Sequence, residues 1–274
     1  PAEAVVVITL DVVRAGPDAI AEMLSRAPSG SVFAVDIVDE DDLRRLALGL
    51  EIAERAGKSF VYRVGPPFVR ARIGQAPRRP LDISDAGFPD GSTRGGLVVV
   101  GSHVGLTSRQ LADLTARRPD ARVVEIDVRS VLDPAQAGDT IASAVAAVVD
   151  GLDAGDVIVH SSRTLVRTDD PEESLAISRT VSDALVAVVS RTLSACTPRF
   201  VIAKGGITSS DVASRGLSIA RATVRGSLFP GIVSVWQSAE GPAAGIPYIV
   251  FAGNVGSDTT LTEAVEKLSK GAAS

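Results

Sequence analysis

The segment Phe200-Val-Ile-Ala-Lys204-Gly-Gly-Ile-Thr-Ser-Ser-Asp211 decides the fold, because it passes from a strand pattern to a helix start through two glycines. Residues 200–203 form a short apolar run, which is typical of a strand that is buried on both faces of a parallel sheet. Gly205 and Gly206 permit a tight turn, and the Thr and Ser residues behind them suit a helix start. Strand, turn and helix in this order predict one βα unit of a layered α/β protein.

Similar units occur along most of the chain, where short β-branched runs alternate with helical patterns. The predicted strands are 5–10, 32–37, 59–63, 97–101, 123–128, 157–160, 200–203 and 248–251. The predicted helices between them include 41–56, 107–118, 135–151, 171–193 and 259–270. We therefore expect an α/β fold with a layered parallel or mixed sheet and helices on both of its faces.

The helix from Pro171 shows the pattern most fully. Asp170 is a suitable N-cap, and Pro171 stands at the first helical position, where a missing N–H costs nothing. An apolar stripe at helical spacing follows, made by Ile177, Val181, Leu185, Val188 and Val189.

Residues 74–96 differ from the rest of the chain, because they are rich in Pro, Gly, Asp and Arg and have no periodicity. This is the composition of a linker. We predict two domains: residues 1–90, a smaller partial α/β segment plus the linker, and residues 91–274, a full α/β domain. The first segment offers few strands and helices, so it is expected to be only part of a larger domain.

The composition argues against several classes of function. A net charge of −5 without a Lys/Arg cluster disfavours a nucleic-acid partner, and 4% aromatic residues disfavour a surface that stacks sugars or bases. One cysteine excludes an intrachain disulfide, and two histidines disfavour a zinc site. The sequence has no apolar run long enough for a membrane span. We expect a cytoplasmic protein without a membrane partner.

Four predicted strands end in loops that are rich in Gly, Ser and Thr: residues 101–107, 160–164, 204–211 and 253–257. Because parallel strands end at the same edge of a sheet, these loops should form one ligand site. Glycines let backbone N–H groups approach an anion, hydroxyls add donors, and Lys204 or Arg163 could neutralise its charge. The loops predict a site for nucleotide phosphates. The alternative for each loop taken alone is an ordinary turn.

Two common nucleotide fingerprints are absent. No Gly-x-Gly-x-x-Gly follows a strand, which disfavours a dinucleotide oxidoreductase. No Gly-x-x-x-x-Gly-Lys-Ser/Thr occurs, which excludes a P-loop protein.

Three of the loops resemble the nucleotide-binding domain of the four-carbon acid sugar kinases, which phosphorylate threonate, erythronate or 3-oxo-tetronate. The resemblance rests on Lys204-Gly-Gly-Ile-Thr-Ser-Ser-Asp211, on Phe251-Ala-Gly-Asn-Val-Gly256, and on Gly101-Ser-His-Val104 followed by Thr107, Gln110 and Leu111. Upstream, Tyr62-Arg63 and Phe68-Val-Arg-Ala-Arg72 resemble the end of the family's substrate domain. The resemblance implies that residues 1–90 are the closing part of a substrate-binding α/β domain plus the linker, and that residues 91–274 are the nucleotide-binding α/β domain. The resemblance implies a sugar-acid kinase that uses ATP and Mg²⁺.

The resemblance also implies the site residues. Ser102 would contact the nucleotide. The position of Lys204 at a strand end beside two glycines suggests that it meets the phosphates; the alternative is a solvated lysine at a strand end. The residues that would wrap the phosphates or close the site are Gly205, Gly206, Ile207, Thr208, Ser209, Gly253, Asn254, Val255 and Gly256. For a substrate carboxylate the candidates are Arg63, Arg70 and Arg72, with surface ion pairs as the alternative. No catalytic base and no metal ligand is assigned.

One family motif, an acidic stretch like Asp-Asp-x-Thr-Gly, is absent. The acidic run Asp39-Glu-Asp-Asp42 lacks the Thr-Gly pair and is interpreted as a helix start. We therefore keep two alternatives to a complete kinase: one subunit of a split kinase, and a non-catalytic nucleotide- or metabolite-binding module. The expected partners are a sugar acid and either a further copy of the chain, a missing N-terminal portion or a second subunit.

Overall fold

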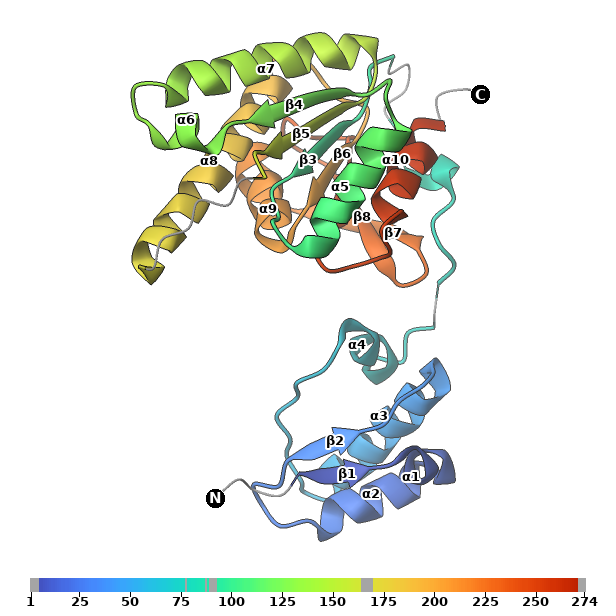
Figure 1. Cartoon of the computed structure of the whole chain (residues 1–274). Coiled ribbons are helices and arrows are strands. Elements are labelled where there is room, and N and C mark those ends of the chain that lie inside the picture. The colour runs from blue at the N-terminus through green and yellow to red at the C-terminus, as the bar shows by residue number, and fades with distance from the viewer. Residues whose placement is uncertain (1–4, 77, 87, 89–92, 164–169, 271–274) are drawn as a thin grey trace. The chain divides into compact units, whose positions relative to one another are not determined.

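The computed structural model describes residues 5–76, 78–86, 88, 93–163 and 170–270. The chain divides into two compact units, Pro1–Arg79 and Pro80–Ser274 (Figure 1). The α/β fold predicted from the sequence is confirmed: a small parallel sheet in the first unit precedes a larger mixed sheet in the second.

The first unit packs helices against a two-stranded parallel sheet. Its elements are β1 (Val6–Ile8), α1 (Leu10–Ala15), α2 (Pro17–Arg26), β2 (Phe33–Val35), α3 (Glu40–Arg55) and α4 (Pro66–Arg72). The core gathers apolar residues from the sheet and from all four helices, among them Ile8, Val13, Ile20, Leu46 and Phe68.

The acidic run starts α3, as predicted. Asp39 is the N-cap and accepts a hydrogen bond from the backbone N–H of Asp42 at 2.9 Å, while the Asp42 carboxylate accepts from the N–H of Asp39. Asp42 is fully buried and also accepts from Arg14 and Arg45. These acidic side chains are therefore held in a structural role.

The strand predicted at 59–63 is wrong, since the described residues place no ladder partner beside this segment. Its alternating aromatic residues pack instead on a helix: the ring of Tyr62 lies 6.3 Å from that of Phe60 and 5.5 Å from that of Phe68. Alternating aromatic residues favour a strand, but a strand also needs a neighbouring strand to pair with.

The second unit contains a seven-stranded sheet in the order β4-β5-β3-β6-β9-β8-β7. The five parallel strands are β3 (Leu97–Val100), β4 (Arg122–Ile126), β5 (Val157–Ser161), β6 (Val201–Lys204) and β9 (Pro247–Phe251). The two strands that pair antiparallel are β7 (Ala222–Phe229) and β8 (Ile232–Ser238).

Helices cover both faces of this sheet (Figure 1). One face carries α5 (Gly105–Arg117) and α10 (Thr260–Lys270), and the other carries α7 (Ala137–Ala154) and α8 (Pro171–Ala195). The side chains of β3 alternate between the layers: Leu97 and Val99 join the α7/α8 core, and Val98 and Val100 join the α5/α10 core. Shorter elements are η1 (Ile83–Ala86), α6 (Val128–Leu132), α9 (Gly206–Asp211) and a π-helical turn at Val212–Gly216.

The sequence prediction missed the β7–β8 hairpin. The hairpin turns at Gly231, whose φ is +72°, and its register shifts between Val224 and Gly226. Strand β7 is the edge of the sheet and is largely exposed, so it has neither a buried apolar run nor a regular alternation.

Part of the segment predicted as a linker belongs to the second unit. The N–H of Leu81 donates to the carbonyl of Ser227 at 2.7 Å, and Lys267 Nζ donates to the carbonyl of Leu81 at 3.0 Å. The compact units therefore divide at residues 79 and 80, whereas the composition had placed the boundary at 90 and 91.

Candidate functional site

The loops after β3, β6 and β9 lie side by side at one edge of the larger sheet, because β6 pairs with β3 on one side and with β9 on the other. The N–H of Gly205 donates to the carbonyl of Phe251 at 2.8 Å, which ties the second loop to the third. A Cβ on Gly205 would lie 3.0 Å from the Cβ of Ser102, which places the first loop equally close. The loop after β5 lies at the same edge, because β5 is the other neighbour of β3, so the structure brings together all four loops singled out in the sequence.

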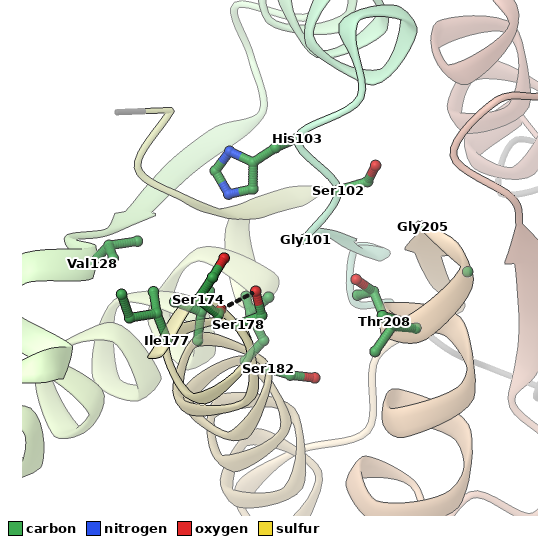
Figure 2. A pocket seen from close by; sticks show the side chains of 14 residues that line it. Gly101, Ser102, His103, Val128, Ser174, Ile177, Ser178, Ser182, Gly205 and Thr208 are labelled. Atoms are coloured by element: carbon green, nitrogen blue, oxygen red, sulfur yellow. Dashed lines mark hydrogen bonds between the residues drawn. The ribbon is translucent and has the colours of Figure 1, made fainter. Parts of the chain in front are cut away.

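A cavity of about 410 Å³ opens between the loops after β3 and β6 on one side and α8 on the other (Figure 2). Figure 2 shows the Gly101–His103 loop opposite the first half of α8, with Gly205 and Thr208 along a further side. The α8 wall is formed by Ser174, Ile177, Ser178, Val181, Ser182 and Leu185. Part of the apolar stripe predicted for the core is therefore cavity wall: Leu185 is buried, but Ile177 and Val181 are only half-buried.

Gly205 has a conformation that requires glycine, with φ of +128°. We expect Gly205→Ala to lower the free energy of unfolding by about 1–3 kcal/mol, because alanine is strained at this φ and its Cβ would crowd Ser102 and Thr208. Urea denaturation measures the change. Gly206→Ala is the matched control, since its φ is not in the left-handed region and its Cβ would meet no atom within 4 Å. Equal effects of the two substitutions would contradict the strain argument.

Lys204 is fully buried at the end of β6, so it is not the solvated lysine considered as an alternative. Its Nζ donates to the carbonyl of Ala252 at 2.7 Å and lies 3.9 Å from the centroid of the Phe251 ring. Burial lowers the pKa of Lys204 to about 8. In the described part of the chain this cation has no carboxylate partner.

Arg163 follows β5 and connects the loop after β5 to the loop after β3. Its guanidinium donates to the carbonyl of Ser102 at 2.8 Å and to the hydroxyl of Ser108 at 2.5 Å, while its buried Nε has no hydrogen-bond partner. Burial lowers the pKa of this guanidinium. No carboxylate pairs with it among the described residues. The sequence named Arg163 as a cation but not as a site residue, since an Arg in a polar loop is usually solvent-facing. Thr164 of the same loop lies outside the described residues.

The two histidines make hydrogen bonds, as expected of structural residues. His160 Nδ1 lies 2.9 Å from the carbonyl oxygen of Ser161, and His103 Nε2 lies 3.3 Å from the hydroxyl of Ser161. Loss of solvent around the ring, and then the charge of Arg163, lower the pKa of His103, which lines the cavity.

The other predicted nucleotide ligands differ in accessibility. Ile207 and Asn254 are exposed, whereas Thr208 and Ser209 are buried. The hydroxyl of Ser209 donates to the carbonyl of Ala203 at 2.7 Å, so it helps to close the end of β6. Val255 is half-buried and is discussed with its loop below.

The arginines proposed for a substrate carboxylate lie in the first unit and have different surroundings. Arg70 pairs with Glu40, and Arg72 pairs with Glu54. These are the ion pairs considered as the alternative. Arg63 is exposed and borders a separate, largely apolar cavity of about 810 Å³.

The described residues lack a metal-binding cluster and a membrane-spanning helix. They contain no group of three or more His, Cys, Asp or Glu side chains that could hold a metal ion. None of the helices in this part of the chain has both the length and the apolar character of a membrane span.

Comparison with protein families gives two matches. The family model of a nucleotide-binding C-terminal domain matches residues 97–261, and that of a sugar-binding N-terminal domain matches residues 2–72. The first match contains all four loops described above. No curated protein matches the sequence.

Solved structures show the same fold. A Salmonella typhimurium LT2 protein with the provisional name tRNA synthase aligns over 95% of the chain with a TM-score of 0.63 and 19% identity. A domain of unknown function from Bordetella bronchiseptica, a domain-swapped dimer with bound citrate, aligns over 96% with a TM-score of 0.55 and 21% identity. A Haemophilus influenzae protein aligns over 97% with a TM-score of 0.52 and 18% identity. The chain spans 59%, 58% and 60% of these structures, respectively.

Proposed function

Because the chain belongs to the four-carbon acid sugar kinase family, we propose that its second unit binds ATP and that the protein transfers the γ-phosphoryl group to a hydroxyl of a four-carbon sugar acid. Threonate, erythronate and 3-oxo-tetronate are the proposed substrates. Mg²⁺ would enter with the nucleotide, since this ion commonly bridges substrate phosphates and retains several waters. Substrate and nucleotide of this kind place the proposed reaction in the cytoplasm.

The observation that carries the proposal is the pair of cations at the loop edge. Lys204 and Arg163 are buried or half-buried, and neither has a carboxylate partner in the described part of the chain. Charges removed from water are normally paired, because an unpaired buried charge is strongly unfavourable. A polyphosphate beside these loops would supply the missing negative charge.

The chain's own groups suit the positioning role that phosphoryl transfer requires. Reactions of this class depend on holding the reactants in line and on neutralising charge, and the nucleotide supplies the reactive phosphoryl group. Arg163 would supply positive charge beside the phosphates, since no carboxylate pairs with it in the described part of the chain. Gly205 would let the backbone approach the phosphates closely, because a side chain there would fill the space beside Ser102.

The cavity along α8 is suited to the nucleoside part. Its volume of about 410 Å³ lies in the range of small-molecule sites, and it joins an apolar wall to a row of serines. Ile177 and Val181 would pack against the base, and the hydroxyls of Ser174 and Ser178 lie beside them.

The sugar acid is assigned to the first unit, because a sugar-binding domain model matches residues 2–72. Arg63 is the proposed carboxylate ligand, since Arg70 and Arg72 already pair with Glu40 and Glu54. The Bordetella relative contains citrate and is a domain-swapped dimer. By analogy, we propose an anionic small-molecule substrate and association with a second copy.

The second candidate function is nucleotide binding without turnover, either as a module or as one subunit of a split kinase. This candidate is favoured because the family's acidic motif is absent and the acidic run at the start of α3 has a structural role: Asp39 and Asp42 cap the helix. Titration calorimetry with ATP and Mg²⁺, followed by a phosphorylation assay with threonate and erythronate, separates the candidates. Turnover supports the kinase, and binding alone supports the second candidate. Absence of nucleotide binding would reject both.

A further inference from the structure

The loop after β9 has four of its carbonyl oxygens held by three buried side-chain donors. Lys204 donates to the carbonyl of Ala252 at 2.7 Å, and Thr107 Oγ1 donates to that of Gly253 at 2.9 Å. Gln110 Nε2 donates to the carbonyls of Val255 and Ser257 at 3.1 and 2.6 Å. Lys204 also reaches the carbonyl of Val255 at 3.5 Å. All three donors are fully buried.

The direction of each of these carbonyls also fixes the direction of the N–H group of the next residue. In a trans peptide the carbonyl of one residue and the N–H of the next point in opposite directions, and the chain has no cis peptide bond. Since the carbonyls of Ala252, Gly253 and Val255 point inward, the N–H groups of the residues that follow them in sequence point outward. Those residues are Gly253, Asn254 and Gly256, and their N–H groups make no hydrogen bond within the described part of the chain.

Gly253 is buried, so the accessible N–H groups of this set are those of Asn254 and Gly256. Gly256 has φ of +86°, a conformation that other residues rarely adopt. Successive N–H groups that point the same way form a binding site for an anion. Asn254 and Gly256 are both exposed, which leaves their amides open to a ligand.

Lys204 is not accessible in the same way. Its side chain has no exposed surface, its Nζ already donates to backbone carbonyls, and the Phe251 ring packs against it at 3.9 Å. A phosphate could reach this ammonium group only if the loop moved. Its charge still acts on the site through the low-dielectric interior.

We propose that Lys204 is a positioning residue, which acts with Thr107 and Gln110 to orient the loop after β9 so that the N–H groups of Asn254 and Gly256 bind the nucleotide phosphates. Lys204 is then not itself a phosphate ligand. The proposal rests on the proposed function for its ligand, but the orientation of the loop is a property of the protein without nucleotide.

The test compares Lys204→Met and Thr107→Val with Lys267→Met as the matched control. Lys267 Nζ also donates to two backbone carbonyls, of Leu81 and Leu228, each at 3.0 Å, but these lie outside the three loops. The ¹⁵N relaxation of the ligand-free proteins gives order parameters for the amides of the loop. We expect them to fall from about 0.85 to below about 0.6 in Lys204→Met, and to fall by a smaller amount in Thr107→Val. Lys267→Met should leave them unchanged.

Titration calorimetry with ADP and with ATP completes the test. If Lys204 orients the loop, Lys204→Met and Thr107→Val both lower the affinity for ADP and for ATP. For the lysine variant we expect a loss of about tenfold. The proposal would be overturned by unchanged order parameters in ligand-free Lys204→Met together with a larger loss of affinity for ATP than for ADP. That result would show that Lys204 is a direct phosphate ligand. If the wild-type protein binds no nucleotide, the proposed function fails, while the order parameters still decide whether Lys204 and Thr107 orient the loop. Should Lys204→Met not fold, Thr107→Val and the control decide the same question.

Discussion

Gly95→Ala is expected to destabilise the second unit by at least about 3 kcal/mol, which is among the larger effects of a single methyl group. A Cβ on Gly95 would overlap the backbone carbonyl of Gly155, and a backbone group cannot rotate away as a side chain can. The Gly95 backbone is itself fixed on both sides: its N–H donates to the carbonyl of Leu152, and its carbonyl accepts from the N–H of Arg199. Urea denaturation followed by circular dichroism measures the loss.

Gly155→Ala is the control for this prediction, because it adds the same methyl group to the opposite member of the same contact. Its Cβ would meet no atom within 4 Å, and its φ of 164° is extended backbone. We expect a change within about 0.5 kcal/mol. If the two variants unfold at the same urea concentration, close backbone contact at Gly95 is not what holds the start of β3.

The sequence predicted the fold best where burial dominates. All four residues of β3 and all four of β6 are buried, so their apolar runs identify strands with helices on both faces. The helix from Pro171 was predicted from its cap, and Asp170 does accept a hydrogen bond from the N–H of Glu172. Where the protein deviates from full burial, as in the exposed edge strand β7, the pattern disappears and the element was missed.

The candidate site was predictable in outline for a different reason. Parallel strands end at one edge of a sheet, so the sequence alone predicts that small, donor-rich loops after separate strands lie close together. The contacts that fix the loops were not predictable, since Thr107 and Gln110 reach the loop after β9 across about 145 residues of sequence. The same holds for Lys204, because a lysine at a strand end gives no sign of whether its Nζ will turn outward or into the protein.

The role of Arg163 could not be predicted from sequence either, and it leads to the strongest functional test. Replacing Arg163 with methionine is expected to weaken ATP binding between about tenfold and a hundredfold, as is typical when a hydrogen bond from a charged donor is lost. The reason is that this guanidinium has no carboxylate partner in the described chain and keeps a buried, unpaired Nε beside the loops. Calorimetry with ATP and with adenosine measures the effect. The affinity for adenosine, which has no phosphates, should change by less than about threefold.

Arg109→Met is the matched control, since it removes the same charge from α5, near the same edge. Arg109 is exposed and already pairs with Asp258 at 2.9 Å, so its charge is neutralised and solvated. We expect its ATP affinity to stay within about twofold of wild type. Because the Arg163 side chain also holds the Ser102 carbonyl, thermal unfolding of both variants must be compared, to separate a displaced loop from a lost charge. A stable Arg163→Met protein that binds ATP as tightly as the control would contradict the phosphate site, because the unneutralised cation is the observation from which that site was inferred.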